Sequence, residues 1–186
     1  INAGAEFCFD EISASAKLCE HARRSEMTFV RILLDGGCDP NAKDYDNRTC
    51  MHLAASEGVR HIVSELIERG AQVNARDRWG RTPLSEAIHG GYVDVARVLI
   101  AAGAEVGYSD NQASQQLCEH ARQGDLEKLQ MLLDGGCDCD AADYDGRSCL
   151  HVACSEGNMH VVKALIDHGV DVNAKDYIGW TPLHYA

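Results

Sequence analysis

The segment DYDNRTCMHLAASEG at 44–58 returns almost unchanged as DYDGRSCLHVACSEG at 143–157. Each copy begins with turn-forming residues and continues with small and apolar residues typical of a short helix. Weaker copies occur between and after these two at a constant step of 33 residues. A fixed step of this length indicates a protein built from stacked structural repeats.

Glycines spaced 33 residues apart mark the ends of consecutive helices. Each follows an apolar helical pattern such as ILLDGG or LIERG. Glycine directly after a helix adopts the left-handed conformation that ends it, which other residues adopt only with strain. The series consists of Gly4, Gly37, Gly70, Gly103, Gly136 and Gly169.

Hydroxyl residues on the same 33-residue step mark helix starts. Their side chains can accept hydrogen bonds from the free N–H groups of a first helical turn. The series is Thr49, Thr82, Ser148 and Thr181, and Pro83 and Pro182 follow two of its members. Proline is favoured at the first helical position, where its missing N–H costs nothing.

Two helices are expected in each repeat. The first is short and ends near Gly58 or its equivalents Gly91, Gly124 and Gly157. The second carries an apolar stripe of helical period, as in Ile62, Val63, Leu66 and Ile67. The segments between repeats are rich in turn residues and poor in apolar ones.

These features resemble the ankyrin repeat. The motifs that carry the resemblance are Thr82-Pro83-Leu84, Thr181-Pro182-Leu183-His184, Val73-Asn74-Ala75 and Val172-Asn173-Ala174. The resemblance covers essentially the whole chain. It implies an all-α solenoid of ankyrin repeats, each with two antiparallel helices and a short β-hairpin finger. We expect repeats at 14–47, 48–80, 81–113, 114–146 and 147–179, with 1–13 ending a preceding repeat and 180–186 opening a further one. The chain is therefore expected to be part of a longer protein.

A second, longer period divides the array. Residues 1–87 align with 100–186, and 45 of the 87 pairs are identical. This indicates duplication of a whole block of three repeats. The segments CFDEIS at 8–13 and GYSDNQ at 107–112 depart from the repeat pattern, and we expect a distorted or open finger at each.

Composition excludes several classes of function. The net charge of −12 over 186 residues argues against non-specific binding to nucleic acid or to anionic membranes. No apolar segment is long enough to cross a membrane, so direct membrane insertion is not expected. The nine cysteines include pairs that lie 99 residues apart, too distant in a stacked array for disulfides. Free thiols of this kind predict a cytoplasmic or other reducing intracellular compartment.

Aromatic and charged residues gather at the expected fingertips. They include Tyr45, Asp46, Arg78, Trp79, Tyr144, Asp145 and Tyr177. Exposed aromatic side chains beside charges are good anchors for a partner protein, and the aspartates suit a partner with a basic contact surface. In the alternative interpretation, each aspartate only closes its own turn and each ring packs on the neighbouring finger.

The short helices supply a second candidate surface, the concave face of the array. Its variable positions include Glu57, His89 and Glu156, together with Glu20, Arg23, Arg24, Ser56, Glu86, Arg122, Gln123 and Ser155. We expect these positions to contact a protein partner along with the fingers.

Catalytic, cofactor and metal sites are not expected. His52, His151 and His184 take the repeat position at which ankyrin histidines usually bond the backbone of adjoining fingers. Cys19/His21 and Cys118/His120 are two residues apart, so on a helix they cannot pair as nucleophile and base. Cys137 and Cys139 lack a second pair of zinc ligands. The chain is therefore predicted to be neither an enzyme nor a cofactor-binding protein.

One modification is suggested by the resemblance. Leu165, Asp171, Val172 and Asn173 are similar to the context in which ankyrin asparagines are hydroxylated by a 2-oxoglutarate-dependent enzyme. Asn74 matches less well, because Gln72 replaces the acid. The alternative is that each asparagine is only a turn residue.

Besides a structural role within a large stable assembly, two functions remain open. The first is a non-catalytic protein–protein interaction or scaffold module. The second is a regulatory or assembly domain tethered to other domains of its own chain. DPNAKDYDNRT, HLAASEG and DRWGRTPLSEAI resemble the cytoplasmic ankyrin regions of plant-type voltage-gated potassium channels, and DRWG is also similar to the ankyrin tails of glutaminases.

Overall fold

The computed structural model describes residues 11–186, with side-chain surroundings described from residue 15 onward. Gly4 and most of the expected preceding repeat lie outside these residues. The chain divides into two compact units, the first extending to Gly107 and the second running from Tyr108 to Ala186. The division falls within the irregular segment at 107–112.

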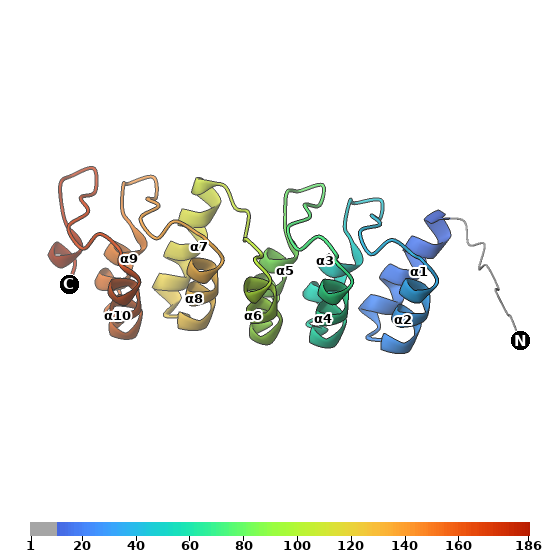
Figure 1. Cartoon of the computed structure of the whole chain (residues 1–186). Coiled ribbons are helices and arrows are strands. Elements are labelled where there is room, and N and C mark those ends of the chain that lie inside the picture. The colour runs from blue at the N-terminus through green and yellow to red at the C-terminus, as the bar shows by residue number, and fades with distance from the viewer. Residues whose placement is uncertain (1–10) are drawn as a thin grey trace, which may run out of the picture. The chain divides into compact units, whose positions relative to one another are not determined.

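Unit 1 consists of three helix pairs. The pairs are α1 (Glu11–Arg23) with α2 (Met27–Asp35), α3 (Cys50–Ser56) with α4 (Arg60–Glu68), and α5 (Pro83–Gly90) with α6 (Val93–Ala101). The first helices pack side by side in the order α1, α3, α5, and the second helices in the order α2, α4, α6. The unit therefore has two helical layers, with the core between them (Figure 1).

Unit 2 repeats this arrangement with two helix pairs and a final turn. The pairs are α7 (Asp110–Gln123) with α8 (Leu126–Asp134) and α9 (Cys149–Ser155) with α10 (Met159–His168). The 3₁₀ helix η1 (Pro182–His184) packs on α9. Leu117, Leu129, Leu150 and Leu165, one from each helix, are fully buried and form the centre of the core.

The predicted helix ends are confirmed where the structure describes them. Gly37, Gly70, Gly103, Gly136 and Gly169 all have φ between 76° and 95°. The short helices end with a second left-handed series that includes Gly58 and Gly124. Ser25 holds the equivalent position after α1 with φ 61°, although serine offered no signal for this conformation.

The predicted helix starts are confirmed as N-caps. Thr49, Thr82, Ser148 and Thr181 are extended residues directly before α3, α5, α9 and η1. Each forms a reciprocal capping pair with the third residue of its helix, which satisfies N–H groups that a first turn leaves free.

Four finger loops precede the next short helix, at 38–49, 71–82, 137–148 and 170–181. Within each unit they project from the same edge (Figure 1). The described residues contain no β-strand; single antiparallel bridges join Lys43 to Thr49 and Ala142 to Ser148. The predicted β-hairpins are thus present as no more than one bridge in two of the four loops.

An aspartate closes every finger. The Asp44 backbone N–H donates to the carbonyl oxygen of Arg48 at 2.8 Å, and its Oδ1 accepts from the N–H groups of Asp46 and Arg48. Asp77, Asp143 and Asp176 make the corresponding bonds. A carboxylate that satisfies its own turn explains why this residue recurs at the fingertip.

The segment at 107–112 does not form an open finger. Asp110 aligns with the finger aspartates, yet it is the first residue of α7, which Ser109 caps together with Gln112. Residues 110–112 of the irregular segment therefore lengthen the helix, and 107–109 precede it without forming a turn. Of the other irregular segment, 8–13, residues 8–10 lie outside the described part and 11–13 belong to α1.

Replacing Gly70 by valine should lower the free energy of unfolding by about 2 kcal/mol, since a branched side chain at positive φ crowds the backbone. Among the described residues, no heavy atom lies within 4 Å of the added Cβ, so the cost comes from the backbone alone. Gly70→Asn is the matched control, because asparagine tolerates this conformation and should cost clearly less. Thermal unfolding followed by circular dichroism measures both, and equal losses would contradict the assignment.

Candidate protein-binding surface

The unit 1 fingertips bring four predicted residues together. Tyr45 is 94 % exposed and Trp79 is 55 % exposed. The Arg78 guanidinium lies 5.9 Å from the centre of the Tyr45 ring and 5.1 Å from that of Trp79. Arg78 also pairs with the Asp46 carboxylate at 2.8 Å. This arginine therefore joins two exposed aromatic rings in one surface.

Backbone bonds hold neighbouring fingers in register. The Arg78 N–H donates to the Asp46 carbonyl oxygen at 2.9 Å, and in unit 2 the Tyr177 N–H donates to the Asp145 carbonyl oxygen at 3.1 Å. Adjacent fingertips in one unit thus present their side chains at a fixed spacing. A rigid set of anchors costs less conformational entropy on binding than a mobile one.

The unit 2 fingertips are more apolar. Tyr144 and Tyr177 are 84 % and 80 % exposed, and Ile178 is exposed beside them. The Asp145 carboxylate pairs with Arg147 at 3.0 Å. The Tyr177 ring lies close to the backbone of Gly146, so it touches the neighbouring finger while most of its surface stays accessible. Tyr177 thus packs on the neighbouring finger as the alternative interpretation expects, and a role of these exposed rings in binding a partner stays a prediction.

Of the predicted concave-face residues, Glu57 and Glu156 lie in ion pairs, whereas His89 is exposed. Glu57 in unit 1 faces Arg23 at 3.7 Å, and Glu156 in unit 2 faces Arg122 at 3.7 Å. His89 is exposed in the last turn of α5. Two of the three residues therefore belong to the same charged arrangement, repeated once in each unit.

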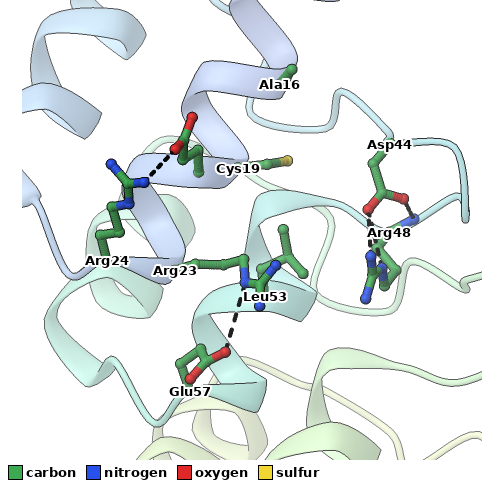
Figure 2. A pocket seen from close by; sticks show the side chains of 9 residues that line it. Ala16, Cys19, Arg23, Arg24, Asp44, Arg48, Leu53 and Glu57 are labelled. Atoms are coloured by element: carbon green, nitrogen blue, oxygen red, sulfur yellow. Dashed lines mark hydrogen bonds and ion pairs between the residues drawn. The ribbon is translucent and has the colours of Figure 1, made fainter.

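An open pocket of about 570 Å³ lies on the concave face of unit 1, between α1, α3 and the first finger. Figure 2 shows Cys19 and Arg23 from α1, Asp44 and Arg48 from the finger, and Glu57 directly after α3 around it. The Arg48 guanidinium is held by Asp44 at 3.0 Å. Arg48 and Cys19 were not predicted as site residues, because nothing in the repeat motif shows that α1 and the finger line the same pocket.

His52 and His151 bond the backbone of the adjoining finger, as expected, whereas the hydrogen bonds of His184 are to Thr181 at the start of its own helix. His52 Nδ1 accepts from the Thr49 N–H at 3.1 Å, and its Nε2–H donates to the Arg81 carbonyl oxygen at 3.1 Å. His151 makes the same two bonds, to Ser148 and Trp180. Each neutral imidazole thereby joins its own helix start to the next finger.

Burial lowers the pKa of His52, although its bond to Arg81 and the nearby Asp77 and Glu86 act in the opposite direction. The eight described cysteines are free. Burial raises the pKa of Cys19 and of Cys118 to about 11. Thiols with so little thiolate at neutral pH are poor nucleophiles and poor metal ligands.

His21 and His120 each contact residues other than the cysteine two positions before them. His21 Nδ1 contacts Glu26, and its ring stacks on Phe29. His120 is buried, burial lowers its pKa, and its Nδ1 lies 4.0 Å from the Asp125 carboxylate. These contacts orient each imidazole toward an acid of the following turn.

Asp138, Cys139 and Asp140 form the one cluster among residues 11–186 whose ligand atoms are close enough to share a metal ion. Both aspartates are exposed, and their carboxylates accept backbone N–H bonds, from Asp140 and from Asp171. Backbone turns thus account for both carboxylates. In the described part of the chain, no helix is both long and apolar enough to span a bilayer.

The candidate hydroxylation sites are both exposed. The Asn74 side chain bridges to the next repeat, donating to the Gly103 carbonyl oxygen and accepting from the Glu105 N–H. Asn173 takes the same position in the last finger. Hydroxylation of either residue stays a prediction, which a mass increase of one oxygen atom in the isolated peptide would test.

A family profile described as ankyrin repeats in three copies matches residues 18–110 and 117–186. The chain therefore belongs to the ankyrin-repeat family, whose members are typically non-catalytic interaction modules. The gap between the two matched ranges, residues 111–116, falls in the extended first half of α7.

Among curated relatives, the chain is 48 % identical over 46 residues to the potassium channel SKOR of Arabidopsis thaliana. It is 47 % identical over 47 residues to the potassium channel KOR1 of Oryza sativa subsp. japonica. Each match covers 25 % of this chain and 6 % of the channel. Ankyrin repeat domain-containing protein 46 of Danio rerio is 40 % identical over 52 residues, or 28 % of this chain and 23 % of that protein.

Stability should fall as the pH drops below about 6.5, partly through His52. A histidine whose folded pKa lies below its unfolded value binds its proton more weakly when folded, so its contribution is complete above pH 6.5 and decreases as the pH falls toward the folded pKa. Melting temperatures of the wild type and His52→Gln between pH 7.5 and 5.5 measure this. Glutamine does not titrate and serves as the same capping partner at Gln112.

The His52→Gln variant should lose less melting temperature over this range than the wild type does. It should keep part of the slope, because burial also lowers the pKa of His120. Parallel curves for the two proteins would contradict the assigned role of His52.

Proposed function

We propose that this ankyrin-repeat array is a non-catalytic protein–protein interaction module, a scaffold element of a longer chain that acts in a reducing intracellular compartment such as the cytoplasm. The observation that carries this proposal is the exposure of the fingertip aromatics, led by Tyr45 at 94 %. Rings of this size gain much by burial at an interface and have few rotatable bonds to immobilise.

The partner is proposed to be a protein with a basic contact surface. The chain carries a net charge of −12, and the tip aspartates Asp46 and Asp145 lie beside the exposed rings. A negative field speeds the encounter with a basic partner and disfavours acidic ones. The same field disfavours nucleic acid as a ligand.

The double variant Tyr45→Ala, Trp79→Ala should weaken binding to such a partner at least tenfold, because it removes two neighbouring anchors and the rings on both sides of Arg78. Crosslinking mass spectrometry on native material identifies the partner, and titration calorimetry compares the affinities. Met159→Ala is the control, since Met159 is an exposed apolar residue on α10, outside the fingers.

Both proteins should melt close to the wild-type temperature, since the residues replaced are on the surface. Unchanged affinity in the fingertip variant would show that Tyr45 and Trp79 are not part of the binding surface.

A second proposal is that the array is a regulatory or assembly domain tethered within a larger protein of the potassium-channel kind. The matches to SKOR and KOR1 support it, although they cover a quarter of this chain and a small part of each channel. The complete reading frame of the parent protein distinguishes the two proposals, because a channel would add membrane-spanning segments. The alternative parent, an enzyme of the glutaminase kind, would add a catalytic domain.

A further inference from the structure

Six of the nine residues that line the unit 1 pocket are identical in unit 2, and one of them is Glu20, which corresponds to Glu119. Cys19, Arg23, Asp44, Arg48 and Glu57 correspond, 99 residues later, to Cys118, Arg122, Asp143, Arg147 and Glu156. By contrast, α2 and α8 share three of nine residues. The two units therefore resemble each other more closely at this concave site than on the helices behind it.

The ion pairs around the two sites also match. Arg23 lies 3.7 Å from Glu57 in unit 1, and Arg122 lies 3.7 Å from Glu156 in unit 2. Arg48 and Arg147 are held by Asp44 and Asp143 in the same geometry. Two ion pairs are thus shared by the two sites. The third acid is paired differently, since Glu20 pairs with Arg24 at 2.7 Å and Glu119 pairs with Arg122 at 3.3 Å.

Of the two kinds of ion pair, only the pair of Arg23 with Glu57, and its equivalent in unit 2, is free to exchange for a ligand. Asp44 accepts two backbone N–H bonds of its own turn and two contacts from Arg48, so this pair belongs to the finger. Arg23 and Glu57 are each about half exposed, and at 3.7 Å they make no direct hydrogen bond. An exposed pair of this kind contributes about 0–1 kcal/mol, so a ligand can replace it at little cost.

The charged residues of the two sites differ in a way that indicates the charge of the ligand. All three carboxylates of the unit 1 site, Glu20, Asp44 and Glu57, have acidic counterparts in unit 2. Among the bases, Arg24 is replaced by Gln123. The site in unit 2 therefore has three acids and two bases, while the site in unit 1 has three of each.

The wall beneath the ion pair is apolar. Leu53 and Cys19 line the unit 1 pocket and are almost fully buried, and Val152 and Cys118 hold these positions in unit 2. Lysine and arginine side chains pack an aliphatic stem on such a surface while the charged end reaches a carboxylate. A guanidinium can bond a carboxylate through two parallel N–H groups.

We propose that the chain contains two equivalent sites, one per unit, and that each accepts a lysine or arginine side chain of an extended partner peptide. Glu57 and Glu156 receive the cationic group, and Arg23 and Arg122 move away from them on binding. The inference rests on the proposed role as a protein-binding module. It adds that the array binds two basic motifs, either two peptides or one partner with a repeated motif.

A random library of 12-residue peptides, selected on the whole chain, tests the proposal. The selected peptides should have lysine or arginine at one fixed position, and a synthetic peptide of that sequence should bind with a stoichiometry of two in titration calorimetry. Glu57→Gln and Glu156→Gln should each reduce the stoichiometry to one, and the double variant should bind at least tenfold more weakly. Glu68→Gln, an exposed carboxylate on α4 outside the pocket, is the control and should change nothing.

A reciprocal exchange provides a second measurement. Arg24→Gln gives unit 1 the charge of unit 2 and should strengthen that site about threefold, whereas Gln123→Arg should weaken the other site by a similar factor. Both positions are exposed, so the fold should tolerate the changes.

Several outcomes overturn the proposal. Selected peptides rich in aspartate or glutamate would mean that Arg23, and not Glu57, binds the peptide. A stoichiometry of one in the wild type would mean that the sites of the two units are not equivalent. If a basic peptide is lost with Tyr45→Ala, Trp79→Ala but not with the Glu57 and Glu156 variants, the fingertips bind it and only the pocket proposal fails. If it is lost with neither set, both the pocket and the fingertip surface are excluded.

Discussion

One imidazole in each of two repeats links the start of a short helix to the next finger, and the rest of each unit depends on that link. His52 accepts from the Thr49 N–H and donates to the Arg81 carbonyl oxygen, which lies 29 residues further along the chain. His151 connects Ser148 to Trp180 in the same way. Because both ring nitrogens are used and buried, losing either bond would leave an unsatisfied polar group in the core. The imidazole thus sets the distance between neighbouring fingers.

Fixed spacing between fingers positions the surface proposed to bind a partner. The backbone bonds from Arg78 to Asp46 and from Tyr177 to Asp145 place aromatic rings of successive repeats side by side. The rings themselves contribute little to the fold, since Tyr45 and Tyr144 are mostly exposed. Framework residues and the residues proposed to bind a partner are therefore separated within one repeat: aspartates and histidines hold the loop, and the residues between them face outward. This separation allows the outward-facing residues to vary while the framework stays the same.

Much of the fold could be predicted because local backbone demands leave clear signals. Left-handed residues favour glycine, and helix starts favour serine or threonine, so both series predicted the register of the helices. The exceptions follow the same physics. Ser25 and Asn47 adopt positive φ without glycine, and α7 begins at Asp110 because Ser109 and Gln112 form a cap that the repeat pattern does not contain. The β-hairpins were overestimated, since aspartate turns close the fingers with little need for strand pairing.

The sequence alone determined the repeat, most of the helix ends and the positions of the fingertips, because these depend on residues within a few positions of one another. It also determined the duplication of the three-repeat block. Only the tertiary structure decided which charges meet. Arg23 and Glu57 are 34 residues apart, and Cys19 shares a wall with Asp44 and Arg48 only because α1 packs beside α3 and its finger. Such contacts come from the packing of separate helices, for which a one-dimensional repeat pattern carries no signal.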